Sequence, residues 1–155
     1  MSVPFKLIAH RGNFKGPNPA RENAPDYIQE ALQAGYYVEV DVRLINGELW
    51  TGHDEPQYRI KDIDLRHPRI YVHSKTIETL YYFLKHHPNI ATFFHDRDEA
   101  TLTSEGEIWT YPGKLLTRRS ICVLPEWNNQ IVPREIKGIC SDYLEIDWTK
   151  TTLQK

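Results

Sequence analysis

The sequence predicts an α/β protein built on a mostly parallel sheet or barrel, and three observations lead to that prediction. Apolar segments follow one another in the order strand, helix, strand, strand, helix, strand, which is typical of βαβ units. Four of these segments end on a histidine or an aspartate, in "LIAHR", "YVHSK", "TFFHD" and "CSDY". Parallel sheets gather functional polar residues at the carboxyl ends of their strands, so we expect these four ends to meet at one edge.

The N-terminal part is expected to form a strand, a loop and a helix. Residues 5–10 are a short apolar segment, and the loop at 11–23 is rich in glycine, asparagine and proline. The helix that follows has Asn23 as its candidate N-cap, Pro25 in its first turn and Gly35 as its terminator. Its apolar residues recur on one face, which predicts an amphipathic helix packed against a sheet.

A hairpin and a second strand–helix unit are expected next. Residues 36–44 alternate as a strand does, and Asn46-Gly47 is a typical turn into a short second strand. Residues 69–75 predict a strand that leads into a helix near 75–87, which Pro88 ends. The apolar positions that recur at helical spacing in it are Ile77, Leu80, Tyr81 and Leu84.

The rest of the chain is expected to add short strands without a long helix. "NIATFFHD" predicts a strand, and "TLTSEGEIWTYPG" predicts a hairpin about Glu105-Gly106. "SICVLPE" and "KGICSDY" predict two more short strands.

Length and composition limit the class of protein. The chain has 155 residues, which suits a single domain over 1–155, and its 40% hydrophobic and 26% charged residues are ordinary for a globular protein. No apolar run reaches the roughly 20 residues of a membrane helix, and no secretory signal is evident, so a cytoplasmic protein is expected. A net charge of −2 with both signs interspersed disfavours nucleic acid as a partner. Cys122 and Cys140 are expected to be buried, reduced thiols. The oligomeric state stays open.

The segment "VEVDVRL" (38–44) places two carboxylates on one face of a strand. Because side chains alternate along a strand, the valines face one way, while Glu39 and Asp41 face the other, about 7 Å apart. Two converging carboxylates suit a hard divalent cation such as Mg²⁺ or Ca²⁺. The alternative is the solvated outer face of an amphipathic strand.

Five ordered segments resemble the glycerophosphodiester phosphodiesterase family, relatives of the phosphatidylinositol-specific phospholipases C. They are "IAHRG" (8–12), "ENAPDYIQEALQAG" (22–35), "VEVDVRL" (38–44), "GHDEP" (52–56) and "GICSDY" (138–143). No segment is specific alone, but their order and spacing match, continuously over roughly the first third of the chain. The resemblance implies a TIM-like (β/α) barrel of the phospholipase-C-like phosphodiesterase type, with one divalent metal ion at its mouth.

The resemblance also implies a role for each matching residue. His10 and His53 would be the acid–base pair, and Arg11 would hold a phosphate oxygen, while Glu39 and Asp41 would ligate the metal. In the family, a hydroxyl of the substrate's own glycerol is thought to attack phosphorus, which gives a cyclic phosphate that is then hydrolysed. An imidazole with a pKa of about 6.5 can accept or donate a proton at neutral pH, which suits this division of roles.

The chain departs from the family pattern in two ways. It is well short of the ~250 residues of an eight-stranded barrel, so a shortened or open barrel is expected. The family's Glu-x-Lys is "HSK" here, which keeps Lys75 as a phosphate-binding candidate and puts His73 at the position of the third metal carboxylate. An imidazole ligand moves the metal preference from Mg²⁺ or Ca²⁺ toward Mn²⁺ or Zn²⁺. Glu126, at the end of "CVLPE", is the alternative third ligand.

Further candidates follow from position alone. His95 ends "ATFFH" and is assigned to contact with substrate phosphate or metal, with local hydrogen bonding as the alternative. Asp142 is expected either to close the mouth, together with Tyr143, or to cap a turn. Tryptophans are expected in the core by default, with Trp50, Trp109 and Trp127 as the candidates for lining a pocket.

Three hypotheses about function remain. The leading one is a metal-dependent phosphodiester hydrolase acting on a small soluble glycerophosphodiester or phosphosugar diester. The second is a non-catalytic phosphate-ester-binding or regulatory domain derived from the same fold, motivated by the missing barrel units and by His73. The third is a purely structural polar cluster.

Overall fold

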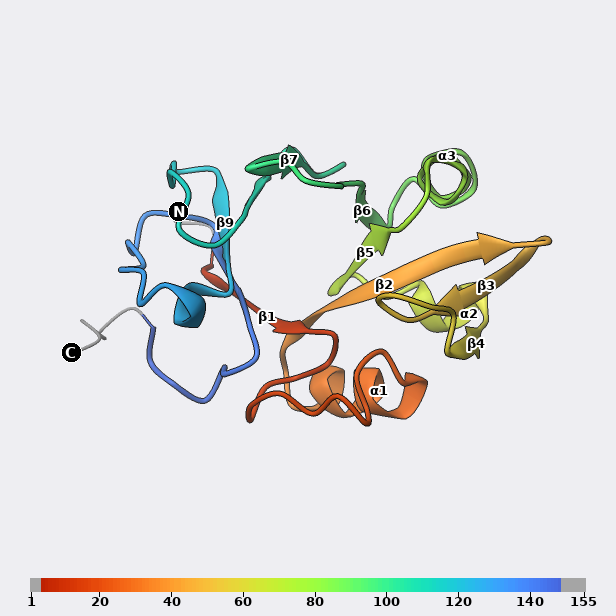
Figure 1. Cartoon of the computed structure of the whole chain (residues 1–155), viewed down its shortest axis with the longest axis horizontal. Helices are drawn as coiled ribbons and strands as arrows, with labels where there is room; N and C mark the ends of the chain where they lie inside the picture. Colours follow the sequence, from red (N-terminus) through yellow and green to blue (C-terminus); the bar gives the residue numbers. More distant parts are fainter. Residues whose placement is uncertain (1–3, 149–155) are drawn as a thin grey trace.

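The computed structural model describes residues 4–148, and its strands curl into a half-barrel (Figure 1). The strands are β1 (Lys6–His10), β2 (Tyr37–Ile45), β3 (Glu48–Thr51), β4 (Tyr58–Ile60), β5 (Ile70–Ser74), β6 (Ala91–Phe93), β7 (Ala100–Leu102), β8 (Ile108–Thr110), β9 (Ser120–Val123) and β10 (Gly138–Ser141). The helices are α1 (Pro25–Gln33), α2 (Asp62–Leu65), α3 (Ile77–His86) and the short 3₁₀ helix η1 (Pro125–Trp127). Strand β4 and helix α2 were not expected from the sequence.

The strands form one sheet whose central pairings are all parallel. β1 lies between β2 and β10, and the sheet continues through β5 and β6 on one side and through β9 and β8 on the other. β3, β4 and β7 are added by antiparallel pairing. After β7 the chain returns to β6, where the Ser104 amide donates to the Thr92 carbonyl at 2.8 Å. The predicted mostly parallel sheet is confirmed, and its strong curl is compatible with an open barrel.

Strand β2 occupies the centre of this arrangement. One of its edges pairs with β1 at Tyr37–Glu39 and then with β3 from Val42 onward, while the other edge pairs with β5. Its valines are buried on the outer face of the sheet, and its two carboxylates face the inside of the curl. Asn46 and Gly47 both have positive φ, as a two-residue type I′ hairpin turn requires.

Helix α1 packs its predicted apolar face on the sheet, but its cap differs from the prediction. Pro25 opens the helix, and Tyr27, Ile28, Ala31 and Leu32 are buried. The N-cap residue is Ala24 and not Asn23, so the predicted cap is wrong. The side chain of Asn23 is instead hydrogen-bonded to β2, so it does not cap the helix.

Helix α3 also begins and ends close to the predicted positions, but it buries another face. Thr76 caps it by accepting a hydrogen bond from the Thr79 amide, and the residues buried against the sheet are Thr79 and Phe83. Three members of the predicted stripe are mostly exposed, namely Ile77, Tyr81 and Leu84. The helix is apolar on more than one side, and the Thr79 hydroxyl determines which side faces β2 by accepting a hydrogen bond from the Leu44 amide.

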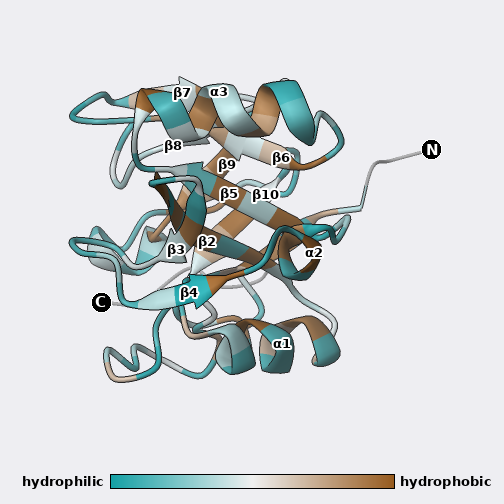
Figure 2. Cartoon of the chain, turned by 90° about the vertical axis from the view of Figure 1, so that its right-hand side faces the viewer, coloured by the Kyte–Doolittle hydropathy of each residue, from teal (hydrophilic) through white to brown (hydrophobic). Residues whose placement is uncertain are grey.

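Two hydrophobic clusters stabilise the sheet from its two faces. The outer cluster packs the β2 valines and the inner sides of α1 and α3 against each other. The inner cluster fills the curl with Ile8, Tyr71, Phe93, Trp109 and the neighbouring side chains of β9 and β10. Hydrophobic residues are concentrated on the strands that lie between α1 and α3 in Figure 2. Both cysteines, Cys122 and Cys140, are buried free thiols.

The last third of the described chain holds no α-helix, as expected from the sequence. After His86 the only helical segment among residues 4–148 is η1, and loops cover the outer face of β9 and β10 through Val132, Ile136 and Trp148. None of the helices in the described residues has the length and apolarity of a membrane-crossing segment.

Candidate active site

A cavity of about 160 Å³ opens at the carboxyl ends of the central parallel strands. Register explains why polar side chains meet there, because His10 pairs with Glu39, and Asp41 pairs with His73, on strands whose side chains alternate. The inner cluster lies below them. The cavity is lined by His10, Arg11, Glu39, Asp41, His53, His73, His95, Trp109, Tyr111, Pro112, Val123, Leu124 and Trp127. Trp50 is not among these residues.

Asp41 is fully buried and carries the densest set of polar contacts in the cavity. The Asn23 amide donates to its Oδ2 at 2.9 Å, and the Asn23 side-chain oxygen accepts from the Asp41 backbone N–H at 3.0 Å. Arg11 Nε lies 3.2 Å from Oδ2, while His73 Nδ1 and Lys75 Nζ lie 3.0 and 3.8 Å from Oδ1. Burial alone would raise the pKa of Asp41, but the positive charges of His73, Arg11 and Lys75 hold it well below its usual range. Asp41 is therefore ionised.

Glu39, Asp41 and His73 form a group that fits a metal ion. One ligand atom from each of the three lies within 4.8 Å of the others, and all three residues are buried. The Arg11 backbone N–H donates to Glu39 Oε2 at 3.2 Å, which fixes the carboxylate. Two carboxylates and one imidazole suit a first-row transition ion better than Ca²⁺. Burial lowers the pKa of His73, but Asp41 and Glu39 outweigh it and raise the pKa above its ordinary value, so metal binding competes with protonation of this imidazole.

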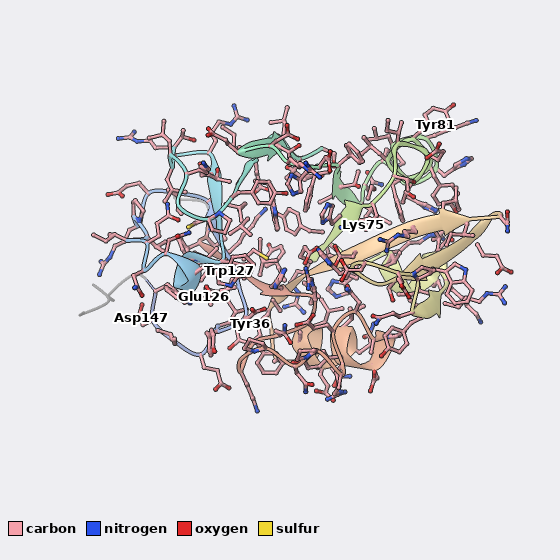
Figure 3. The ribbon with its side chains drawn as sticks, viewed as in Figure 1. Tyr36, Lys75, Tyr81, Glu126, Trp127 and Asp147 are labelled. Carbon is pink, nitrogen blue, oxygen red and sulfur yellow. The ribbon has the colours of Figure 1, made fainter. Side chains whose placement is uncertain are left out.

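Glu126, the alternative third ligand, lies elsewhere. Its carboxylate on η1 accepts hydrogen bonds from Ser141 Oγ at 2.9 Å and from the Asp142 amide at 3.0 Å. Burial raises its pKa. Glu126 and Lys75 are well separated in Figure 3. The structure thus brings His73, and not Glu126, beside Glu39 and Asp41.

His10 is held by a carboxylate from the far end of the chain. Its Nδ1 donates to Asp142 Oδ1 at 2.8 Å, and Asn13 Nδ2 donates to the same oxygen at 2.9 Å. Burial lowers the pKa of His10, but Asp142 and Glu39 raise it above its ordinary value. Burial also works against the Asp142 carboxylate, yet His10 and Asn13 keep the pKa of Asp142 low. His10 therefore faces the cavity with Nε2, while Nδ1 is committed to Asp142.

The loop after β1 supplies residues that sequence reasoning did not assign to the site. Glu22 accepts from Arg11 Nη1 at 3.1 Å and from Asn13 Nδ2 at 2.9 Å. Asn13 Oδ1 in turn accepts from the Tyr27 hydroxyl at 2.9 Å, which ties the loop to α1. In the sequence, these contacts could have been predicted from the Glu-Asn pair at 22–23, which is part of the resemblance.

His53 reaches the same cavity from a loop instead of a strand. The Arg43 guanidinium donates to the carbonyls of Gly52, His53 and Asp54, so this loop is held by its backbone. The imidazole Nδ1 lies 2.8 Å from Asp54 Oδ1, and 41% of the side chain is exposed. Partial burial lowers the pKa of His53, assisted by Arg11 and opposed by Asp41.

An aromatic wall lies next to the metal-binding group, on the side of His73. The rings of His95 and Tyr111 stack with centroids 3.8 Å apart, and His95 lies 5.7 Å from the His73 ring. Burial, and then the charge of His73, lowers the pKa of His95 to about 4, so its imidazole is neutral at pH 7. Trp109 is buried beneath this wall and stacks on Phe93 at 4.5 Å.

Unpaired polar atoms concentrate at this cavity. Within residues 4–148, the buried side-chain nitrogen and oxygen atoms without a hydrogen bond all belong to residues that line it: Arg11 Nε, Asp41 Oδ1, His73 Nε2, His95 Nδ1 and Tyr111 OH. Arg11 Nε and Asp41 Oδ1 have only ion-pair contacts. Native interiors leave few such groups, and a bound ligand is one explanation for them. The cavity therefore has the composition of a binding site for an ion or a polar molecule.

Comparisons with known proteins add no relative. No protein-family model matches the chain, and neither a curated protein nor a solved structure is significantly similar to it.

Proposed function

We propose that this chain is a metal-dependent phosphodiesterase of the glycerophosphodiester phosphodiesterase type, built on a shortened, open TIM-like barrel. The observation that carries the proposal is the convergence in one cavity of two histidines, Arg11 and the group Glu39, Asp41 and His73. Phosphoryl transfer requires positioning, charge neutralisation and proton transfer, and these side chains are suited to all three. Their order along the chain also matches the resemblance found in the sequence.

The residues present fit a divalent ion. Asp41 Oδ1 and His73 Nε2 are buried without hydrogen bonds, and two carboxylates with an imidazole are a common ligand set. Glu39, Asp41 and His73 would hold the ion, which when bound neutralises charge on the phosphate oxygens as a Lewis acid. Arg11 would hold another phosphate oxygen with Nη2, since Nε and Nη1 already contact Asp41 and Glu22.

The two histidines would move the protons. His53, whose pKa is lowered, would accept the proton of the attacking hydroxyl as a neutral imidazole. His10, whose pKa is raised and whose Nδ1 donates to Asp142, would donate a proton from Nε2 to the oxygen of the leaving alcohol as the phosphorus–oxygen bond breaks. When the attacking hydroxyl belongs to the substrate, the product of this step is a cyclic phosphate. Water then opens that ring with the two roles reversed, which restores both histidines.

Turnover tests the proposal. Bis(p-nitrophenyl) phosphate and glycerophosphocholine would be assayed with Mg²⁺, Ca²⁺, Mn²⁺ and Zn²⁺ in turn. His10→Ala and His53→Ala should each lower kcat/KM by about 10²–10⁴-fold. The matched control is His86→Ala, which removes an exposed histidine of α3 and should leave the rate unchanged. Unchanged rates in both His10→Ala and His53→Ala would show that the acid–base assignment is wrong.

One observation favours a second function, phosphate-ester binding without turnover. Arg11, His73 and Lys75 already surround Asp41, so an anion could be held without a metal. Calorimetric binding of a phosphate ester in the presence of a chelator, with no product formed, would support this function. If a chelator and a phosphate ester both leave the melting temperature unchanged, the polar cluster is purely structural.

A further inference from the structure

One side of helix α3 exposes three large apolar side chains. Ile77, Tyr81 and Leu84 are 69%, 63% and 50% exposed. Their spacings of four and three residues place all three on one stripe of the helix. No other helix or strand within residues 4–148 exposes more than one large apolar side chain. Single exposed apolar residues are common in proteins, but a stripe at helical spacing is typical of a surface that another element covers.

This apolar stripe of α3 faces away from the rest of the molecule. The helix already packs another side on the sheet through Thr79 and Phe83. Tyr81 lies at the outer edge of α3 and points away from the sheet in Figure 3. None of the three stripe residues belongs to either hydrophobic cluster or lines the cavity. Whatever covers the stripe therefore comes from outside residues 4–148.

Two opposite charges flank the stripe and indicate what covers it. Glu78 and Lys85 are both exposed, and Lys85 Nζ lies 5.6 Å from the centroid of the Tyr81 ring. Seven residues are nearly two helical turns, so Glu78 and Lys85 lie on the same flank, about 10 Å apart along the axis, which is too far for an ion pair within one chain. A two-fold axis that crosses the stripe makes two copies of α3 antiparallel and brings Glu78 of each copy to Lys85 of the other. A parallel pair would bring like charges together.

We infer that the chain forms a symmetric homodimer in which two copies of α3 pack antiparallel through Ile77, Tyr81 and Leu84, with Glu78 of each copy paired to Lys85 of the other. Tyr81 lies at the middle of this interface, close to the two-fold axis. The helix has ten residues and is about 15 Å long, so the interface is smaller than the ~1,200 Å² of a stable complex. We therefore expect a weak dimer with a Kd of about 10–100 µM. The inference does not rest on the proposed function.

Sedimentation equilibrium of the full chain tests the inference. At low ionic strength, the average mass should rise from 18.2 kDa toward twice that value as the concentration increases from about 1 µM to about 1 mM. Tyr81→Glu should raise the Kd by at least about 10-fold, because it places two carboxylates together at the axis. The matched control is Leu115→Glu. Leu115 is also exposed, but its loop precedes β9, which lies on the opposite side of the molecule from α3 in Figure 1, so the Kd should not change.

A charge exchange tests the antiparallel arrangement. Glu78→Lys and Lys85→Glu each replace two attractions by two repulsions, so each should raise the Kd by at least about 5-fold at low ionic strength. The double variant exchanges the two partners and should return the Kd to within about 2-fold of the wild type. Because Glu78 and Lys85 cannot meet within one chain, this recovery requires contact between copies. All three positions on α3 are exposed, so the variants should fold, which thermal melting checks.

The outcomes decide the inference whether or not the chain hydrolyses diesters. Loss of the dimer in Tyr81→Glu together with recovery in the double charge variant would support it. A chain that stays monomeric up to about 1 mM would overturn it, and binding of that monomer to phosphatidylglycerol vesicles would assign the stripe to a lipid surface instead. A dimer that is unchanged in Tyr81→Glu, or single charge variants that the double variant does not rescue, would also overturn it.

Discussion

His10 and His53, two of the four histidines that line the cavity, show how equal distances can have unequal consequences. His10 and His53 each lie 2.8 Å from an aspartate oxygen. The Asp142 side chain beside His10 is 8% exposed, whereas the Asp54 side chain beside His53 is 89% exposed. Water screens the exposed pair and leaves the buried one strong. The strand side of the cavity, formed by β1, β2 and β5, is thus held by side-chain contacts, and the loop side, residues 52–57, is held by its backbone.

The largest effect is expected when the strand side loses a charge. Asp41→Asn keeps the shape of the side chain but removes the buried carboxylate that Arg11, His73 and Lys75 share. We expect a loss of about 3–5 kcal/mol of stability, measured by urea unfolding. Asp54→Asn on the loop side is the control and should change stability by less than about 0.5 kcal/mol. Equal stabilities for the two variants would contradict the difference between the two sides.

The next largest effect is a difference in activity between variants of the two aspartates, Asp142 and Asp54. Asp142→Asn should lower kcat/KM by about 10²-fold or more, because His10 loses the carboxylate that fixes its tautomer and stabilises its charged form. Asp54→Asn should change kcat/KM by less than about 3-fold, since the Asp54 side chain is exposed. Steady-state kinetics on one diester measures both. If Asp54→Asn lowers kcat/KM more than Asp142→Asn does, the expectation that the buried aspartate contributes more to activity is wrong.

A backbone change should affect the loop side selectively. A Cβ on Gly52 would lie 1.9 Å from the Glu55 carbonyl oxygen, so Gly52→Ala has to shift the loop that carries His53. We expect kcat/KM to fall by about 10-fold, because displacement of a catalytic group by about 1 Å is costly. Gly47→Ala is the matched control: Gly47 also has a positive φ, but nothing lies within 4 Å of its Cβ position. It should cost about 1 kcal/mol of stability and no activity.

The smallest expected effect concerns the stability of the metal-free protein, to which His10 and His53 should contribute with opposite pH dependence. The pKa of His10 is raised on folding, so His10 contributes stability below pH ~6.5 that is lost as pH rises through its folded pKa. The pKa of His53 is lowered, so its contribution is present above pH ~6.5 and is lost as pH falls through its folded pKa. His10→Gln should therefore be most destabilising at pH 5, and His53→Gln at pH 8. Melting temperatures at both pH values measure this, and a change of 1 kcal/mol corresponds to about 2–4 °C.

Much of the strand side could be predicted from the sequence because strand alternation is a local rule. The segment at 38–44 assigned Glu39 and Asp41 to one face, and "YVHSK" placed His73 at a strand end, where the register brings it to Asp41. Parallel pairing could be expected from the order of strands and helices. These inferences needed only the period of the chain and the general geometry of βαβ units.

The remaining contacts could not be predicted because they depend on how the sheet curls. From its neighbours in the sequence, Asn23 is predicted to cap a helix. In the structure, both ends of its side-chain amide are hydrogen-bonded to Asp41, eighteen positions away. Nothing near Tyr111 in the sequence indicates that it stacks on His95. Helix α3 shows the same limit, because a helix with apolar residues on several sides does not reveal which side a curled sheet will cover.

The pairing of β2 with three other strands restricts where the length of this chain can change. One residue inserted between Tyr37 and Asp41 would exchange the faces of the strand beyond it, turning valines into the cavity and carboxylates onto the helices. The same insertion would shift the pairing with β3 or β5. Segments such as 113–119 and 128–137 lie outside the strands and do not line the cavity, so they can lengthen without moving a cavity side chain from one face to the other. Homologous chains are therefore expected to vary in length there and to keep the length of β2.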